Sequence, residues 1–127
     1  MNETTIYYAH HQWKYGTKVE EYELNLIKRY FPHATVFNPS VDLDIKGRTE
    51  EEIMETCLDT VRNSDIVIFS SMDGMVGKGV YTELLEAQNH GKLVLYISRN
   101  RLTTEYRSYI TPEYGTDRLY AEFYSDN

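Results

Sequence analysis

The sequence predicts an α/β protein in which helices flank both sides of a mainly parallel β-sheet. Two observations support this prediction. First, short segments rich in β-branched and aromatic residues alternate along the chain with longer segments whose apolar residues recur at helical spacing. Second, IVIF at 66–69 and LVLYI at 93–97 are almost continuously apolar, which is typical of parallel strands buried on both faces. A chain of 127 residues suits a single domain, residues 1–127.

The first half of the chain supplies two strands, each followed by a helix. Residues 5–9, TIYYA, and residues 34–38, ATVFN, are the strands. Residues 17–31 form the first helix, whose apolar side chains at helical spacing are Val19, Tyr22, Leu26 and Tyr30. The next helix begins after Thr49, because this threonine and Glu52 have the spacing of a capping box.

The second half continues this alternation and then loses it. Residues 66–69 form the third strand, a helix begins near Lys78, and residues 93–97 form the fourth strand. Beyond Arg99 the chain is rich in tyrosine and weakly periodic, which predicts an irregular stretch with one edge strand, LYAEFY, at 119–124. Strands and helices in this order indicate a Rossmann-like (flavodoxin-like) sheet with right-handed crossovers.

Composition and charge narrow the class of partner. Twenty acidic and thirteen basic residues give a net charge of −7, which opposes binding to a nucleic-acid polymer. No apolar run is long enough for a membrane span, the polar start MNETT is unlike a secretion signal, and the single cysteine cannot form an internal disulfide. No group of His, Cys and acidic residues has zinc spacing, so we expect neither a metal nor a cofactor. These features predict a cytoplasmic protein, in the host cytoplasm if its origin is viral.

In an open α/β sheet, ligands bind at the carboxyl ends of the strands. Three segments follow such ends, residues 10–13, 38–46 and 70–79. His10 comes directly after the first strand, where its side chain can face the crevice and contact a phosphate or move a proton. Trp13 either stacks on a nucleobase or packs under a loop.

Glu83 lies where an apolar residue is expected. In a helix that begins near Lys78, it shares one side with Val80, Leu84 and Ala87. It also lies close to the helix start, where the helix dipole and free amide groups stabilise a negative charge. Glu83 is therefore either an ionised carboxylate that faces the crevice or a residue at the margin of the apolar stripe that meets solvent.

The same helix start contains the sequence Gly77-Lys78-Gly79. Its backbone amides, together with the charge of Lys78, can hold a phosphate, which favours a nucleotide over a free nucleoside as the ligand. Alternatively, the two glycines only let the strand and the helix meet closely. The spacing alone does not separate these two interpretations.

The order of these segments resembles one family. SDIVIF at 64–69, GVYTELLEA at 79–87 and GKLVLYI at 91–97, together with TIYYA at 5–9, are similar to segments of nucleoside 2-deoxyribosyltransferases and related nucleotide N-glycosidases. The likeness covers most of residues 4–97. It implies cleavage or exchange of the N-glycosidic bond of a nucleotide or (deoxy)nucleoside.

The resemblance also implies roles for single residues. Glu83 corresponds to the nucleophile that attacks the anomeric carbon and forms a covalent intermediate, so the anomeric configuration is retained. Tyr7 corresponds to the tyrosine that orients this glutamate, although Tyr8 takes that place if the strand register differs by one. Gly79 corresponds to the turn glycine of the motif. We therefore expect Tyr7, Asp65 and Glu83 to converge on the crevice.

Two positions depart from the family pattern. Gly77 stands where an aspartate or serine is common, and Asp73 is the nearest replacement for its contact with the sugar or phosphate. Cys57 stands where an aspartate often handles the base; Asp59 is the nearest replacement, and Cys57 itself fits the packed side of its helix. These departures support an alternative function, a binding module that recognises or sequesters a nucleotide without turnover.

The resemblance finally bears on partners. Family members are typically homo-oligomers in which a neighbouring subunit helps to close the site. The aromatic segment Tyr106–Tyr124 suits an interface, because tyrosine rings bury area while their hydroxyls keep a partner. We therefore expect a homo-oligomer with an even number of subunits, and a small-molecule nucleotide or nucleoside as the ligand.

Overall fold

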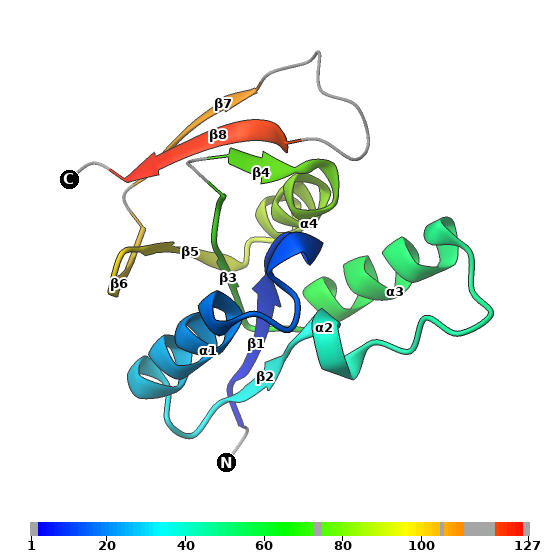
Figure 1. The fold of residues 1–127 in the computed structure, drawn as a ribbon, viewed down its shortest axis with the longest axis horizontal. Helices are drawn as coiled ribbons and strands as arrows, with labels where there is room; N and C mark the ends of the chain where they lie inside the picture. The colour runs from blue at the N-terminus through cyan, green and yellow to red at the C-terminus, as the bar shows by residue number, and fades with distance from the viewer. Residues whose placement is uncertain (1–2, 73–74, 105, 111–118, 126–127) are drawn as a thin grey trace.

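The structure is a computed structural model, and it describes residues 3–72, 75–104, 106–110 and 119–125 (Figure 1). The strands are β1 (Thr5–Ala9), β2 (Thr35–Phe37), β3 (Ile66–Phe69), β4 (Met75–Gly77), β5 (Leu93–Ser98), β6 (Arg101–Thr103), β7 (Tyr106–Ile110) and β8 (Leu119–Ser125). The helices are the short 3₁₀ helix η1 (Gln12–Lys14) and the α-helices α1 (Lys18–Tyr30), α2 (Pro39–Asp42), α3 (Glu50–Arg62) and α4 (Lys78–Asn89).

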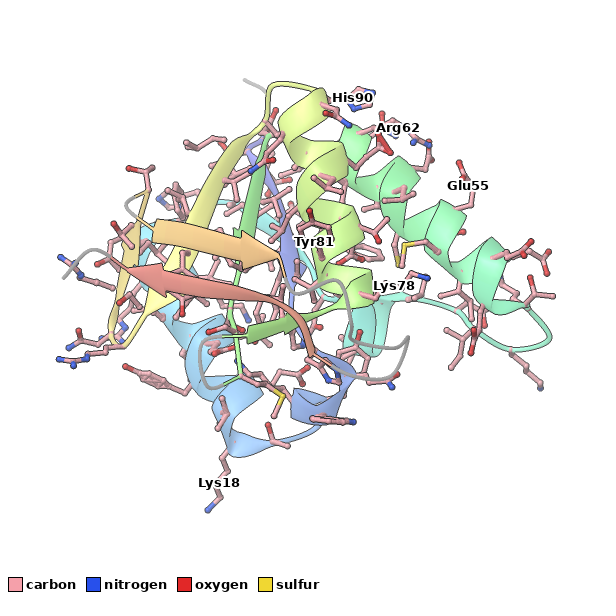
Figure 2. The ribbon with its side chains drawn as sticks, turned by 90° about the horizontal axis from the view of Figure 1, so that it is seen from above. Lys18, Glu55, Arg62, Lys78, Tyr81 and His90 are labelled. Atoms are coloured by element: carbon pink, nitrogen blue, oxygen red, sulfur yellow. The ribbon has the colours of Figure 1, made fainter. Side chains whose placement is uncertain are left out.

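A five-stranded sheet with the order β2-β1-β3-β5-β6 forms the centre of the fold. β2, β1, β3 and β5 are parallel, and β6 pairs antiparallel with β5. α1 lies on one side of this sheet, and α3 and α4 lie on the other (Figures 1 and 2). The predicted fold class, an α/β fold with a mainly parallel sheet flanked by helices on both sides, is confirmed.

β1 lies inside the sheet and supplies side chains to the packed layers on both sides. Tyr7 and Ala9 pack in one hydrophobic cluster with residues of α3 and α4, while Ile6 and Tyr8 pack in the other with residues of α1. Successive side chains of a strand point to opposite faces. The two neighbouring tyrosines therefore belong to different sides of the molecule.

Two helices begin where the sequence predicts, at their capping residues. The Thr17 side chain accepts a hydrogen bond from the backbone N–H of Glu20 and caps α1. At the start of α3, Thr49 accepts from the N–H of Glu52, and the Glu52 carboxylate accepts from the N–H of Thr49. These bonds satisfy amide groups that the first helical turn leaves free.

The packed side of α1 differs from the predicted one. Its buried residues are Glu20, Glu23, Leu26 and Ile27, and the large apolar residues left exposed are Val19, Tyr22 and Tyr30. Two buried carboxylates replace the expected apolar side chains because each has a partner outside the helix. Glu20 is hydrogen-bonded to His10 and Glu23 to Lys14, and both partners precede the helix. Helical spacing alone does not reveal this compensation.

The C-terminal strands form a second sheet, with the order β4-β8-β7. β8 pairs antiparallel with both β4 and β7, so the predicted edge strand exists but does not join the main sheet. The stretch predicted to be irregular contains β7. A period-two pattern identifies a strand but not the strand with which it pairs. The side chains of the aromatic segment lie outside the described part, so its interface stays a prediction.

Among the described residues, no helix combines the length and the apolar composition that a membrane crossing requires.

Candidate active site

A buried tyrosine–glutamate pair lies at the start of α4, beside the carboxyl ends of the parallel strands. The Tyr7 hydroxyl, on β1, donates a hydrogen bond to Oε2 of Glu83. Tyr7 is 0% exposed and Glu83 is 7% exposed. Of the two positions that the sequence allows for Glu83, the structure shows the inward one, packed against the sheet rather than at a solvent margin.

Cys57 is the third member of this group. It belongs to α3, is 5% exposed, and its thiol is hydrogen-bonded to the Glu83 carboxylate and in contact with the Tyr7 hydroxyl. Burial, and next the nearby carboxylate, raise the pKa of this thiol to about 11, so it remains a protonated donor at neutral pH. The cysteine thus packs, as its helical position predicts, but also contacts the candidate nucleophile.

The Glu83 carboxylate is stabilised by neutral donors alone. Burial raises its pKa to about 7, while the hydrogen bonds from Tyr7 and Cys57 act in the opposite direction. No lysine, arginine or histidine of the described ranges forms an ion pair with it. A carboxyl group of this kind changes its charge near neutral pH, and such titration is frequent at functional sites.

The start of α4 contains two glycines, Gly77 and Gly79, on either side of Lys78. Gly77 is the N-cap and makes no side-chain hydrogen bond to the first turn, so no side chain of the cap residue occupies these amides. A side chain at Gly79 would meet only the Met54 methyl at 3.6 Å, an ordinary contact, so close packing does not require this glycine. Lys78 between them is exposed. Gly77 itself is buried and pairs with β8, so Lys78 is the exposed residue at this helix start.

Of the three acidic residues in the sequence prediction, the two that the structure describes do not join this group. Asp65 is at the opposite edge of the sheet, where its Oδ2 accepts from Thr5 N at 2.9 Å, so its expected convergence with Tyr7 and Glu83 is wrong. It opens β3, and parallel strands bring residues that open a strand to the amino-terminal edge. Asp59 lies on the outer face of α3, with Oδ1 at 3.6 Å from Arg62 Nη2 and a side chain that is 66% exposed. Asp73 is outside the described residues.

The other predicted ligand contacts lie on the α1 side of the sheet or in the segment that follows β1; they are Tyr8, His10 and Trp13. Tyr8 is 0% exposed, and its hydroxyl donates to Glu23 Oε1 at 2.5 Å, so Tyr8 is not the partner of Glu83. His10 is buried, stacks on Tyr8, and its Nε2 lies 2.7 Å from a Glu20 carboxylate oxygen. Trp13 is 56% exposed, and its ring packs against His11 without being buried under a loop.

Tyr15 is a residue that the sequence analysis did not single out. Its ring contacts His10, with the ring centroids 4.9 Å apart, and the residue is 38% exposed. Desolvation of the hydroxyl first, and then the charge of Glu83, raise its pKa. Tyr15 thus packs beside His10 in the segment after β1. Its place in the polar segment after the first strand was the available signal, but the sequence contains several tyrosines in loops.

A network of buried polar groups on the α1 side was also missed. Lys14 Nζ donates to Glu23 Oε2 at 3.0 Å, to Ser70 Oγ at 2.8 Å and to the Ser71 carbonyl at 2.7 Å. Ser70 Oγ in turn donates to Glu23 Oε1 at 2.7 Å. These residues come from η1, α1 and the segment after β3, so only the tertiary structure brings them together. Among the described residues, no group of three or more His, Cys, Asp or Glu could hold a metal ion.

Comparison with known proteins identifies a similar fold. The 2-desoxiribosyltransferase from Leishmania mexicana matches with a TM-score of 0.55 and 21% sequence identity. The match covers 75% of this chain and 64% of that chain, so this chain spans less than two thirds of its structural neighbour. The likeness shows a shared fold. No model of a known protein family matches the sequence, and no curated protein sequence does.

Proposed function

We propose that this chain cleaves or transfers the N-glycosidic bond of a nucleotide or nucleoside, with Glu83 as the nucleophile and Tyr7 as the residue that orients it. The observation that carries the proposal is the hydrogen bond from the Tyr7 hydroxyl to the buried Glu83 carboxylate, beside the carboxyl ends of the parallel strands. This edge is where open α/β sheets bind ligands. The fold shared with a 2-desoxiribosyltransferase supports the same chemistry.

In this proposal the two carboxylate oxygens have different tasks. Oε2 of Glu83 keeps its hydrogen bond from Tyr7, and Oε1 attacks the anomeric carbon. As the Oε1–carbon bond forms, the carbon–nitrogen bond breaks, and its electron pair leaves with the base, which takes up a proton from solvent. Water or a second base then attacks the same carbon and releases the carboxylate, so two inversions give net retention.

The attack requires an ionised carboxylate. Because burial raises the pKa of Glu83 to about 7, a large share of the protein is protonated and inactive below neutral pH. Base release should therefore increase as the pH rises through 7. In this proposal the exposed Lys78, in the first turn of α4, would hold a substrate phosphate through its positive charge, together with backbone amides of that turn.

A second candidate function is a binding module that holds a nucleotide without turning it over. Glu83 is only 7% exposed, and the cavity of about 660 Å³ in the described structure is lined by residues of the α1 side, not by Glu83. Cys57 and Gly77 also lack the carboxylate or hydroxyl that family members commonly have at these positions. In this alternative the Tyr7–Glu83 pair is a structural hydrogen bond.

Base release separates the two candidates. Purified protein is incubated with ribo- and deoxyribonucleosides and their 5′-monophosphates, and free base is quantified by chromatography. We expect release from at least one of these compounds, with a loss of at least about 1000-fold in Glu83→Gln, because an amide cannot act as the nucleophile. Glu86→Gln is the matched control on the same helix; its carboxylate pairs with Arg62, so this variant should keep activity.

Two outcomes contradict the proposal. Activity that persists in full in Glu83→Gln excludes Glu83 as the nucleophile. Saturable binding of a nucleotide with no release of base from any compound of the panel identifies the chain as a binding module.

A further inference from the structure

The cavity of about 660 Å³ lies on the side of the sheet opposite Glu83. It is lined by η1 and α1, by the segment after β3, and by β5 with the turn that follows it. Its size is in the range of small-molecule sites. Glu83, Tyr7 and Cys57 are not among its lining residues. The catalytic group proposed above therefore leaves this cavity without a role.

A network of buried polar side chains lines part of the cavity. Lys14 and Glu23 are each 7% exposed, and together with Ser70 they satisfy one another through hydrogen bonds of 2.7–3.0 Å. Ser71 Oγ and the Tyr96 hydroxyl form a second polar pair, 2.7 Å apart. Burying an ion pair is costly, and a small number of fixed polar groups beside apolar and aromatic side chains is typical of binding sites.

Flat rings and positive charge lie around this network. Trp13 and Tyr22 both line the cavity, and they are 56% and 41% exposed. The charge of Glu23, the one carboxylate among the described lining residues, is balanced by Lys14. This leaves Arg99 and Lys18, neither of which forms an ion pair within the described ranges. Lys18 extends into solvent from the first turn of α1 (Figure 2), and its flexible side chain can fold toward an occupant.

Arg99 holds its place at the cavity in an unfavourable backbone conformation. Its φ is 60°, in the left-handed region that favours glycine, and it alone among the described non-glycine residues has a positive φ. It occupies the tight turn between β5 and β6, where glycine or asparagine is the usual choice. Strained residues of this kind are often found at ligand sites.

We propose that this cavity is a second small-molecule site, for a flat aromatic ring that carries a negatively charged group, as a nucleoside monophosphate does. The ring stacks on Trp13 and Tyr22, and Arg99, with Lys18, binds the anionic group. The polar network forms no part of the charge recognition, because its donors and acceptors are already paired. The site is distinct from Glu83 and does not depend on its chemistry.

The chain contains its own reporter for this site. Trp13 is the single tryptophan, so the fluorescence of the protein reports on the cavity. Titration with adenosine 5′-monophosphate should change this emission saturably. Adenosine, which lacks the charge, and inorganic phosphate, which lacks the ring, should each bind at least about tenfold more weakly, since one charge-assisted contact contributes about this factor.

One variant tests the role of Arg99 through two quantities that should change in opposite directions, the affinity for the ligand and the Tm. Arg99→Gly should weaken the binding of adenosine 5′-monophosphate about tenfold or more and raise the Tm by about 2–5 °C, because glycine relieves the left-handed backbone. Arg101→Gln is the matched control: Arg101 lies two residues further, in β6, and does not line the cavity. This control should keep the affinity.

Failure here and failure of the proposed enzymatic function are distinguishable. Glu83→Gln should keep the Trp13 response, and Arg99→Gly should keep base release. The proposal is overturned if millimolar adenosine 5′-monophosphate gives no saturable change in emission. It is equally overturned if Arg99→Gly, folded and at least as stable as the wild type, binds with unchanged affinity.

Discussion

Two neighbouring tyrosines of β1 each hold a buried glutamate, on opposite sides of the same sheet. Tyr7 donates to Glu83 of α4, and Tyr8 donates to Glu23 of α1. Both carboxylates are 7% exposed. In both pairs a tyrosine hydroxyl donates to a glutamate carboxylate, and the two carboxylates are equally buried. They differ in what else surrounds the carboxylate.

The difference lies in a single positive charge. Glu23 accepts hydrogen bonds from Tyr8 and Ser70 and also pairs with Lys14 at 3.0 Å. Among the described residues, the hydrogen-bond donors to Glu83 are the Tyr7 hydroxyl and the Cys57 thiol, both neutral. An ion pair neutralises a buried carboxylate and keeps it in a structural role, whereas neutral donors leave it poised between its two protonation states. The partner of a buried glutamate, rather than its burial, therefore indicates its role.

Removing that positive charge should have the largest effect on stability. Lys14→Met keeps the length of the side chain but leaves the Glu23 carboxylate buried without a cation, so we expect the free energy of unfolding to fall by about 3–5 kcal/mol in urea titrations. The double variant Lys14→Met with Glu23→Gln should recover a large part of this loss. If the single variant loses less than about 1 kcal/mol, the ion pair is not what stabilises the α1 side.

The Tyr7–Glu83 pair should instead make the free energy of unfolding depend on pH. Burial raises the pKa of Glu83 from 4.5 to about 7. Between these values the folded chain keeps a proton that the unfolded chain has released. The contribution of this proton to the free energy of unfolding is thus complete below pH 4.5, falls as the pH rises, and is lost above about pH 7. The total change is about 3 kcal/mol.

Urea titrations at pH 5 and pH 7.5 measure this contribution. The decrease of the unfolding free energy between the two values should be smaller in Glu83→Gln than in the wild type by about 2 kcal/mol, because a part of the total change lies below pH 5. Glu55→Gln, whose side chain is 71% exposed on α3, is the control and should keep the wild-type decrease. An equal decrease in the wild type and Glu83→Gln would show that Glu83 ionises in the folded chain as it does in the unfolded one.

The smallest effect concerns the thiol that contacts Glu83. Cys57→Ala removes one of its donors, so the pKa of Glu83 should rise by about half to one pH unit, whereas Cys57→Ser keeps a donor and should not raise it. The Glu83 carboxyl carbon, followed by NMR across pH 5–9, reports this value without any need for turnover. Equal titration midpoints in the alanine and serine variants would reduce Cys57 to a packing residue.

The four parallel strands and the three long helices could be predicted from the sequence, whereas α2, β4, β6 and β7 were not predicted. The apolar segments at 66–69 and 93–97 are strands, and Thr17 and Thr49 cap their helices, because strand burial and capping depend on residues close in the chain. The position of Glu83 on the packed side of its helix also follows from a period of 3.6 residues.

Only the tertiary structure decided which groups meet. Whether Tyr7 or Tyr8 faces Glu83 depends on strand register, and a shift of one residue would exchange them. The inward side of α1 depends on Lys14, which binds Glu23 only because the segment between β1 and α1 folds back over the sheet. The cavity at Arg99 likewise joins segments far apart in the sequence. Hydrogen bonds and ion pairs act over a few ångströms in space, and the spacing of residues along a chain does not encode those distances.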